Sequence, residues 1–198
     1  HYWLRMSEEE IKHEAVERKA EFTINLDEKE EPVGSAVINH LLQGALEYYM
    51  QSSRWFAGKI KAIKSIGIED MIPIRGLSSE TYLLIVNAVY KESEPQDYLI
   101  SITISFSRDA GFIEQEYPRS VIAKLKKDNQ EGLVYDSSFD NEFRMKLLEV
   151  IRKRKKIKGV NGTLAARRGR LFKKLDVYEP EENVSKLLGA EQSNTSML

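Results

Sequence analysis

Apolar and polar residues alternate most regularly in the middle of the chain, between residues 81 and 106. Over residues 98–106 every second position is an isoleucine or an aromatic residue, and serine or threonine fills most of the positions between them. This period of two is typical of a strand with one buried face. Residues 81–90 carry apolar side chains on both parities, which indicates a strand buried on both faces. The polar link at residues 92–96 predicts that the two strands form an antiparallel hairpin.

Two other segments carry apolar residues at the three- and four-residue spacing of an amphipathic helix. The first covers residues 35–50, with Ser35 as its expected N-cap, and the second covers residues 140–153, with Asp140 as its expected N-cap. We expect the face of the first helix that carries Leu42 and Leu46 to pack against protein. The expected apolar faces are Val37, Ile38, Leu41, Leu42, Ala45, Leu46 and Tyr49 in the first helix and Phe143, Leu147, Leu148 and Ile151 in the second.

The remaining segments give weaker patterns. Residues 60–74, 120–126 and 132–136 predict further strands, and residues 163–175 predict one or two strands turned around Gly169. Residues 2–5 have the content of a short strand, residues 7–20 favour a helix, and residues 184–188 favour a short strand or helix. The acidic stretch at residues 27–34 contains Pro32 and Gly34 and reads as a linker. Runs of strands bounded by helices predict an α+β fold, with an antiparallel sheet flanked by helices.

Composition narrows the function classes. The chain has 198 residues, of which 41% are hydrophobic, and no apolar run reaches the length that spans a bilayer. It has no cysteine, which removes disulfides, thiolate nucleophiles and cysteine metal ligands and is compatible with the cytoplasm, the location we expect. Its histidines, His1, His13 and His40, have no metal-ligand spacing, and a packed His40 is the favoured interpretation. We therefore expect no metal site in this chain.

The net charge of −1 hides one acidic and one basic segment. Residues 8–31 are rich in acids, whereas over residues 144–174 Glu149 is the only acid. The densest basic run, Arg152 to Lys158, suits a phosphate backbone. It suits the solvated C-terminal end of a helix better, because basic groups favour the negative end of the helix dipole and no aromatic residue interleaves the run to stack on bases. Polyanion or nucleic-acid binding therefore stands as the second hypothesis, and a scaffold for assembly as a third.

Two short stretches carry candidate functional residues. The sequence SSRWFAGK places three large side chains at the end of a helix, before a glycine that can adopt a left-handed C-terminal conformation. This cluster favours packing by aromatic and cation–π contacts over a binding surface. Its residues are Arg54, Trp55, Phe56, Gly58 and Lys59. The sequence QSNTS near the end offers hydroxyls and amides for phosphate contact, but it lacks the glycine pattern of a Walker loop. Its residues are Gln192, Ser193, Asn194, Thr195 and Ser196.

Together with two further stretches, these sequences resemble bacterial maltokinases. SSRWFAGKIKAI at residues 52–63 is similar to a signature near the start of that family, and GTLAARRG at residues 162–169 is similar to the late part of its N-terminal cap domain. EQSNTSML at residues 191–198 resembles the family's entry into the kinase N-lobe, whose loop lies near the ATP phosphates. HYWLRM at residues 1–6 looks like the last strand of a trehalose synthase β-domain.

The resemblance implies a middle piece of a fused trehalose synthase/maltokinase polypeptide. It divides the chain into residues 1–6, the end of the synthase β-domain; 7–34, a linker; 35–178, the cap domain; and 179–198, the truncated start of the kinase N-lobe. The parent would phosphorylate maltose to maltose 1-phosphate with ATP and magnesium and would interconvert maltose and trehalose. This chain alone is expected to have no catalytic residue, to bind no cofactor, and to have the remaining kinase and synthase domains as its partners in cis. Membranes and nucleic acids are not expected partners.

Overall fold

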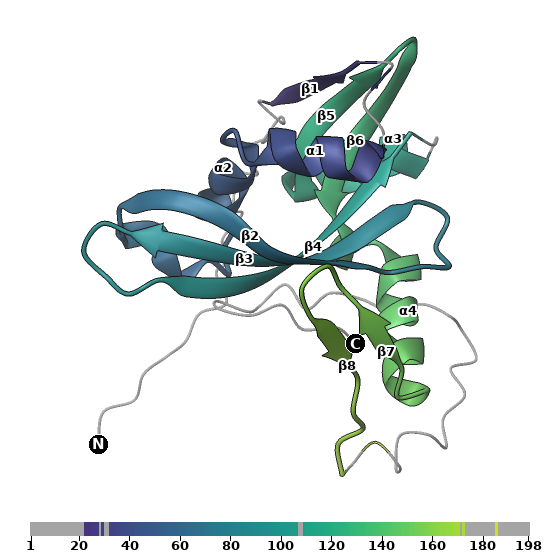
Figure 1. Cartoon of the computed structure of the whole chain (residues 1–198). Helices are drawn as coiled ribbons and strands as arrows, with labels where there is room; N and C mark the ends of the chain where they lie inside the picture. Colours follow the sequence, from purple (N-terminus) through teal and green to yellow (C-terminus); the bar gives the residue numbers. More distant parts are fainter. Residues whose placement is uncertain are drawn as a thin grey trace, which may run out of the picture.

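A six-stranded sheet organises the chain (Figure 1). The computed structural model describes residues 22–27, 29, 32–106, 109–170, 172 and 185. The strands of the sheet are β1 Thr23–Leu26, β2 Ile63–Pro73, β3 Glu80–Tyr90, β4 Gln96–Ser105, β5 Val121–Lys127 and β6 Gln130–Asp136. They lie in the order β1-β5-β6-β4-β3-β2, in which β1 runs parallel to β5 and every other pair is antiparallel. With its separate helices, this sheet confirms the predicted α+β class.

The other elements lie on the two sides of this sheet. The helices are α1 Val33–Leu41, α2 Ala45–Ser52, α3 Asp109–Glu116 and α4 Asn141–Arg152. Three short 3₁₀ turns are η1 Ala57–Ile60, η2 Pro118–Ser120 and η3 Ser137–Phe139. A separate antiparallel pair consists of β7 Lys156–Lys158 and β8 Thr163–Ala165.

The central hairpin forms as its alternation predicts. Strands β3 and β4 are antiparallel neighbours, with Thr81 opposite Thr103 and Leu84 opposite Ile100. Strand β2 pairs with β3 along its whole length, and its register shifts between Ile68 and Asp70 and near its start. The sequence predicted β2, β5 and β6 as well, but it did not predict β1, which lies in the expected linker and joins the edge of the sheet.

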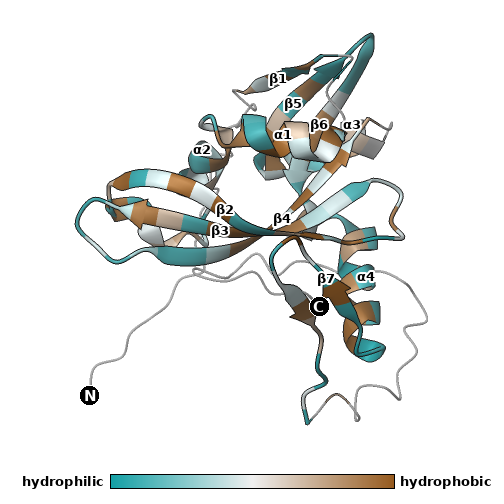
Figure 2. Ribbon diagram, viewed as in Figure 1, coloured by the Kyte–Doolittle hydropathy of each residue, from teal (hydrophilic) through white to brown (hydrophobic). Residues whose placement is uncertain are grey.

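Helices α1 and α2 cover one face of the sheet. Their buried side chains meet a continuous apolar surface from β3, β4 and β5, in which Leu84, Val86 and Ile102 are fully buried. Figure 2 shows hydrophobic residues recurring along β2 and β3 and on α1. Burial of this kind of surface is the main favourable term in folding. The main core therefore lies between these two helices and the sheet.

The single helix that the sequence predicted over residues 35–50 is in fact two. Gly44 has a φ of 123°, a conformation that L side chains rarely adopt, and the chain turns there between α1 and α2. The turn brings Leu46 into the core but leaves Leu42 38% exposed, so the packing prediction is right for Leu46 and wrong for Leu42. Ser35 is not the N-cap, because α1 already begins at Val33.

Helix α4 and the β7–β8 pair lie on the opposite face. Phe143 of α4 is buried with Ile72, Ile74 and Leu83 in a second, smaller core. Asp140 caps α4 as predicted, since its side chain accepts a hydrogen bond of 2.8 Å from the Glu142 amide. The predicted apolar face is wrong at Leu148, which is exposed.

The strand prediction for residues 163–175 is confirmed only at its start, within the residues that the structure describes. Thr163–Ala165 forms β8, residues 166–169 continue without regular structure, and residues 171 and 173–175 lie outside the described residues. The expected strand at residues 2–5 and the expected helix at residues 7–20 lie outside the described residues, as do residues 184 and 186–188. In the described ranges, no helix is both long enough and apolar enough to cross a membrane.

Candidate functional site

The aromatic residues of the SSRWFAGK stretch pack against the sheet. The chain leaves α2 at Ser53 and places Phe56, which is 2% exposed, 5.0 Å from Tyr98 between ring centroids. Trp55 is half-buried, and its ring centroid lies 6.1–6.3 Å from those of Tyr49, Phe56 and Tyr98. Packing is confirmed for both residues, although Phe56 rather than Trp55 is the buried anchor.

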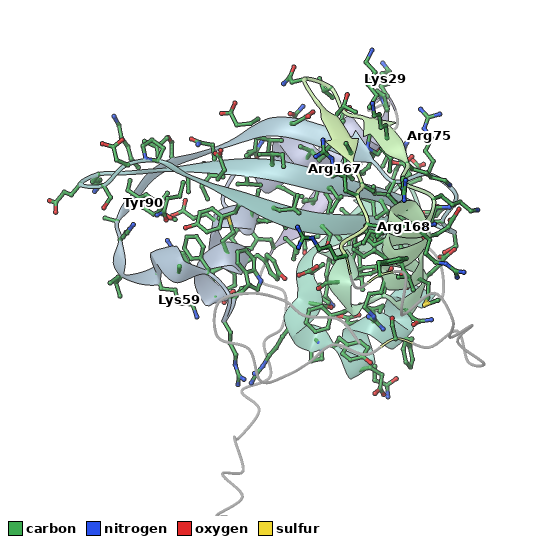
Figure 3. The ribbon with its side chains drawn as sticks, turned by 90° about the horizontal axis from the view of Figure 1, so that it is seen from below. Lys29, Lys59, Arg75, Tyr90, Arg167 and Arg168 are labelled. Carbon is green, nitrogen blue, oxygen red and sulfur yellow. The ribbon has the colours of Figure 1, made fainter. Side chains whose placement is uncertain are left out.

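The glycine and the two cations of this stretch have different roles from those expected. A Cβ at Gly58 would collide with the Tyr90 hydroxyl and lie 2.6 Å from the Phe56 ring, so Gly58 permits close packing and is not a left-handed helix end. Arg54 and Lys59 are exposed, and no cation–π contact or ion pair involves either within the described residues. The cation over the Tyr90 ring is instead Lys61, 5.0 Å from the centroid. Figure 3 shows Lys59 and Tyr90 at one end of the molecule, away from Arg75 and Arg168.

A buried polar cluster around Asp136 lies beneath α2. Its carboxylate accepts hydrogen bonds from the Tyr49 hydroxyl at 2.5 Å, the Ser101 hydroxyl at 2.8 Å and the Ser138 amide at 2.9 Å. Burial, followed by the charge of Asp136, raises the pKa of Tyr49 well above its usual value. Because Asp136 is only 6% exposed and accepts from three donors, one of them on α2, the cluster ties α2 to the sheet.

A basic hollow lies on the opposite face of the sheet, between the end of β2, α4 and β7. Its volume is about 330 Å³. The residues that line it, which define the basic hollow, are Pro73, Ile74, Arg75, Lys146, Val150, Lys155, Lys156, Ile157 and Lys158. Five of the nine are cations, and three others, Ile74, Val150 and Ile157, form an apolar wall. The hollow therefore combines concentrated positive charge with an apolar surface.

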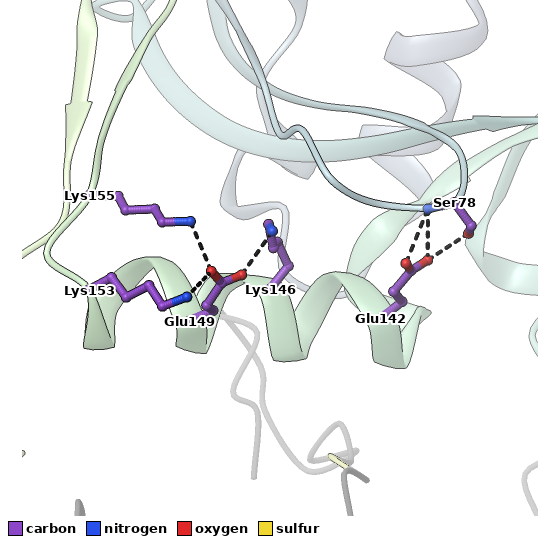
Figure 4. Close-up of polar contacts among 6 residues, drawn as sticks. All are labelled: Ser78, Glu142, Lys146, Glu149, Lys153 and Lys155. Atoms are coloured by element: carbon purple, nitrogen blue, oxygen red, sulfur yellow. Dashed lines mark hydrogen bonds and ion pairs between the residues drawn. The ribbon is translucent and has the colours of Figure 1, made fainter.

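Glu149 organises the lysines at one side of the basic hollow (Figure 4). Its carboxylate lies 2.8 Å from the ammonium groups of Lys146 and Lys155 and 2.9 Å from that of Lys153. Hydrogen bonds from these three lysines hold the pKa of Glu149 well below its ordinary value. One carboxylate cannot neutralise three ammonium groups, so the cluster keeps a net positive charge.

The basic run at Arg152 to Lys158 does not simply continue a helix. Lys153 and Arg154 form a turn in which Arg154 has a φ of 49°, and Lys156–Lys158 then forms β7. The first residue of the run therefore belongs to the last turn of α4, whereas its last three residues belong to β7. Arg168, from the GTLAARRG stretch, donates from Nε to the Arg152 carbonyl oxygen at 2.9 Å, which satisfies a carbonyl at the end of α4.

The turn between β7 and β8 is attached to β2 through Asp70. The Asp70 carboxylate accepts from its neighbour's amide, Met71 N, at 2.8 Å and from the Asn161 amide at 2.9 Å. The Asn161 side chain also donates to the Glu69 carbonyl at 2.6 Å. These backbone donors lower the pKa of Asp70. The GTLAARRG stretch is therefore anchored to the sheet at its start and to α4 near its end.

A polar clasp joins the start of α4 to Ser185. Arg144 is 9% exposed and donates to the Ser138 carbonyl, to the Ser185 hydroxyl and to the Ser185 carbonyl, each at 2.7 Å. Asn141 accepts from the Ser185 amide at 2.8 Å and from its hydroxyl at 3.0 Å. We call Asn141, Arg144 and Ser185 the clasp. It fixes a position in the segment that leads toward Gln192.

The structure brings together residues that the sequence did not connect. Arg75 and Lys146 join the basic hollow from distant parts of the chain, and no sequence pattern pointed to them. Gln192, Ser193, Asn194, Thr195 and Ser196 lie outside the described residues, as do His1 and His13, while His40 is half-buried on α1. In the part of the chain that the structure describes, no group of histidine, aspartate and glutamate side chains could hold a metal ion.

No protein-family model matches the chain, and no curated protein matches its sequence.

Proposed function

We propose that this chain is the non-catalytic N-terminal cap of a maltokinase, carried in a polypeptide fused to a trehalose synthase. The proposal starts from the resembling stretches at residues 52–63, 162–169 and 191–198. Two of them fall within the described residues, and both contribute to holding one α+β body together. Phe56 and Gly58 pack against the sheet, while Asn161 and Arg168 attach the second stretch and its leading turn to β2 and α4.

The clasp is the observation that best supports a positioning role. Ser185 precedes the QSNTS stretch by a few residues, and four hydrogen bonds hold it to Asn141 and Arg144. Arg144 is buried and also donates to the Ser138 carbonyl, so the clasp extends into the body of the fold. In this proposal the clasp sets the position from which the chain enters the kinase N-lobe.

Phosphoryl transfer depends on such positioning, because the enzyme contributes mainly alignment and electrostatic stabilisation. In the parent, ATP and magnesium would supply the phosphoryl group and its charge neutralisation, and residues 192–196 would lie beside the nucleotide phosphates. The cap would act on the reaction only through the position of that loop. Loosening the clasp should therefore impair phosphorylation without touching any group that performs chemistry.

The test uses the full parent polypeptide with Arg144→Ala, Ser185→Ala and, as a matched surface control, Arg170→Ala. A displacement of about 1 Å can cost on the order of 100-fold in rate, so we expect Arg144→Ala to lower kcat/KM for maltose phosphorylation at least about tenfold. Ser185→Ala removes only one hydroxyl and should give a smaller loss in the same direction. Trehalose formation should stay unchanged in all variants.

Two results would count against the proposal. One is a parent in which both clasp variants phosphorylate maltose as fast as Arg170→Ala. The other is an equal loss of phosphorylation and trehalose formation, which would show general unfolding in place of a positioning effect. Thermal melts of each variant separate these cases, and Ser185→Ala keeps the test valid if Arg144→Ala does not fold.

A further inference from the structure

The basic hollow is a feature that the proposed cap role does not explain. Its cations come from three elements that are separate in sequence: Arg75 follows β2, Lys146 lies on α4, and Lys155 to Lys158 run into β7. Two contacts bring these elements together. Phe143 packs α4 against the sheet, and the hydrogen bond from the Asn161 amide to Asp70 holds the β7–β8 turn to β2. Like charges repel, so gathering five of them around one concavity favours an anionic occupant.

Part of this charge is organised before any ligand arrives. Glu149 holds the Lys146 and Lys155 ammonium groups at 2.8 Å, and the Lys146 side chain is only 18% exposed. An ammonium group has three donors, so each of these lysines keeps donors beyond its bond to Glu149. Ordering them in the free protein reduces the entropy that a ligand would otherwise lose on binding.

The other cations leave their charge unbalanced. Among the residues that the structure describes, Arg75, Lys156 and Lys158 form no ion pair, and all three are exposed. Arg75 presents a planar guanidinium, which matches two oxygens of a phosphate group. A tetrahedral anion in the hollow would therefore meet both an arginine and lysines of fixed position.

The size and the walls of the hollow decide which anion fits. A volume of about 330 Å³ suits a small molecule, and the lining residues include no aromatic side chain on which a base could stack. Ile74, Val150 and Ile157 offer an apolar wall to the carbon part of such a molecule. These features favour a small phosphate ester over the extended backbone of a nucleic acid.

We propose that the basic hollow binds a phosphate monoester, with Arg75, Lys156 and Lys158 contacting the phosphate and Lys146 and Lys155 held in place by Glu149. This site is independent of the proposed cap role, because it involves neither the clasp nor residues 192–196. The shared chemistry is the phosphoryl dianion, so free phosphate and a sugar phosphate are both ligands of this site. The apolar wall should make the sugar phosphate bind more tightly.

The experiment is calorimetric titration of the whole chain with inorganic phosphate, glucose 1-phosphate and a duplex DNA oligonucleotide. The double variant Lys156→Ala/Lys158→Ala removes two cations from the hollow. Its matched control, Lys64→Ala/Lys91→Ala, removes two exposed lysines elsewhere. Charge-assisted bonds that remain partly solvated predict binding of glucose 1-phosphate about tenfold weaker in the first variant and unchanged in the second.

A third variant, Arg75→Ala, should also weaken binding of glucose 1-phosphate about tenfold. It tests the phosphate site if the double variant does not fold. Three results would overturn the site. They are an absence of saturable binding of either phosphate probe, an equal loss in the hollow and control variants, and tight DNA binding with steep salt dependence in the absence of phosphate binding. The last result would assign the same residues to a polyanion surface.

Discussion

Removing one hydroxyl from the core tests whether the Asp136 cluster ties α2 to the sheet. Tyr49→Phe keeps the ring and nearly all of the volume, so it creates no cavity. It removes the 2.5 Å hydrogen bond to the Asp136 carboxylate, which keeps the Ser101 hydroxyl and the Ser138 amide as donors. The change in stability therefore reports the loss of one buried bond to a carboxylate.

The structure also sets the magnitude. A hydrogen bond to a charged group contributes about 1.5–3 kcal/mol. The Ser101 hydroxyl and the Ser138 amide both donate to Oδ1 of Asp136, so Tyr49→Phe takes the Tyr49 donor away from the buried Oδ2, and we expect a loss of about 2–3 kcal/mol. Tyr82→Phe is the matched control, because it removes the same atom from an exposed 3.2 Å bond to Glu80. Solvent replaces that bond, and the expected loss is below about 0.5 kcal/mol.

Urea unfolding of the two variants, followed by circular dichroism, measures both values. A second readout is alkaline unfolding: the pKa of Tyr49 is raised in the folded state, so its contribution is full below the ordinary tyrosine pKa of 10.0 and is lost as pH rises above it. Tyr49→Phe should therefore lose less stability between neutral and alkaline pH than the unmodified protein. Equal losses in the two phenylalanine variants at neutral pH would refute this account of the cluster.

Three further outcomes are expected. Glu149→Gln should make the melting temperature depend less on pH in the acid range. The depressed pKa of Glu149 stabilises the fold above its ordinary value of 4.5, and this contribution disappears as pH falls below that value. An unchanged pH dependence of the melting temperature in the variant would contradict this. Phe56→Ala should cost about 3–5 kcal/mol in urea unfolding, and Trp55→Ala clearly less, because Phe56 is the buried ring; the reverse order would contradict the packing described. Asp70→Ala should speed hydrogen exchange at the Asn161 amide, and equal exchange in both proteins would show that the carboxylate does not hold the turn.

The strands could be predicted because their patterns are local. Residues 98–106 alternate at all but one position, Leu99, and residues 81–90 are apolar on both parities. Predicting their pairing then required only the short polar link between them. Asp140 was predictable as a cap for the same reason, since capping involves only its own next residues. β1 gives no such signal. Its four residues form a strand because they pair in parallel with β5 at the edge of the sheet.

Other features depend on tertiary context that periodicity does not contain. The apolar spacing of residues 35–50 continues across Gly44, so the pattern alone does not show that the chain turns there and exposes Leu42. The composition of the basic run favours a solvated helix end, yet three of its seven residues, Lys156–Lys158, form β7. The basic hollow was beyond prediction, because Arg75 and Lys146 join it only through the packing of α4 on the sheet.

The central proposal is that this chain positions the nucleotide loop of a maltokinase and contributes no catalytic residue. The most direct measurement compares formation of maltose 1-phosphate from maltose and ATP with magnesium by three proteins: this chain alone, the full parent polypeptide, and the parent with residues 193–196 replaced by alanine. The account predicts no product from the chain alone, product from the parent, and impaired phosphorylation with intact trehalose formation in the variant. A parent that does not phosphorylate maltose, or a variant that does so at the full rate, would contradict it.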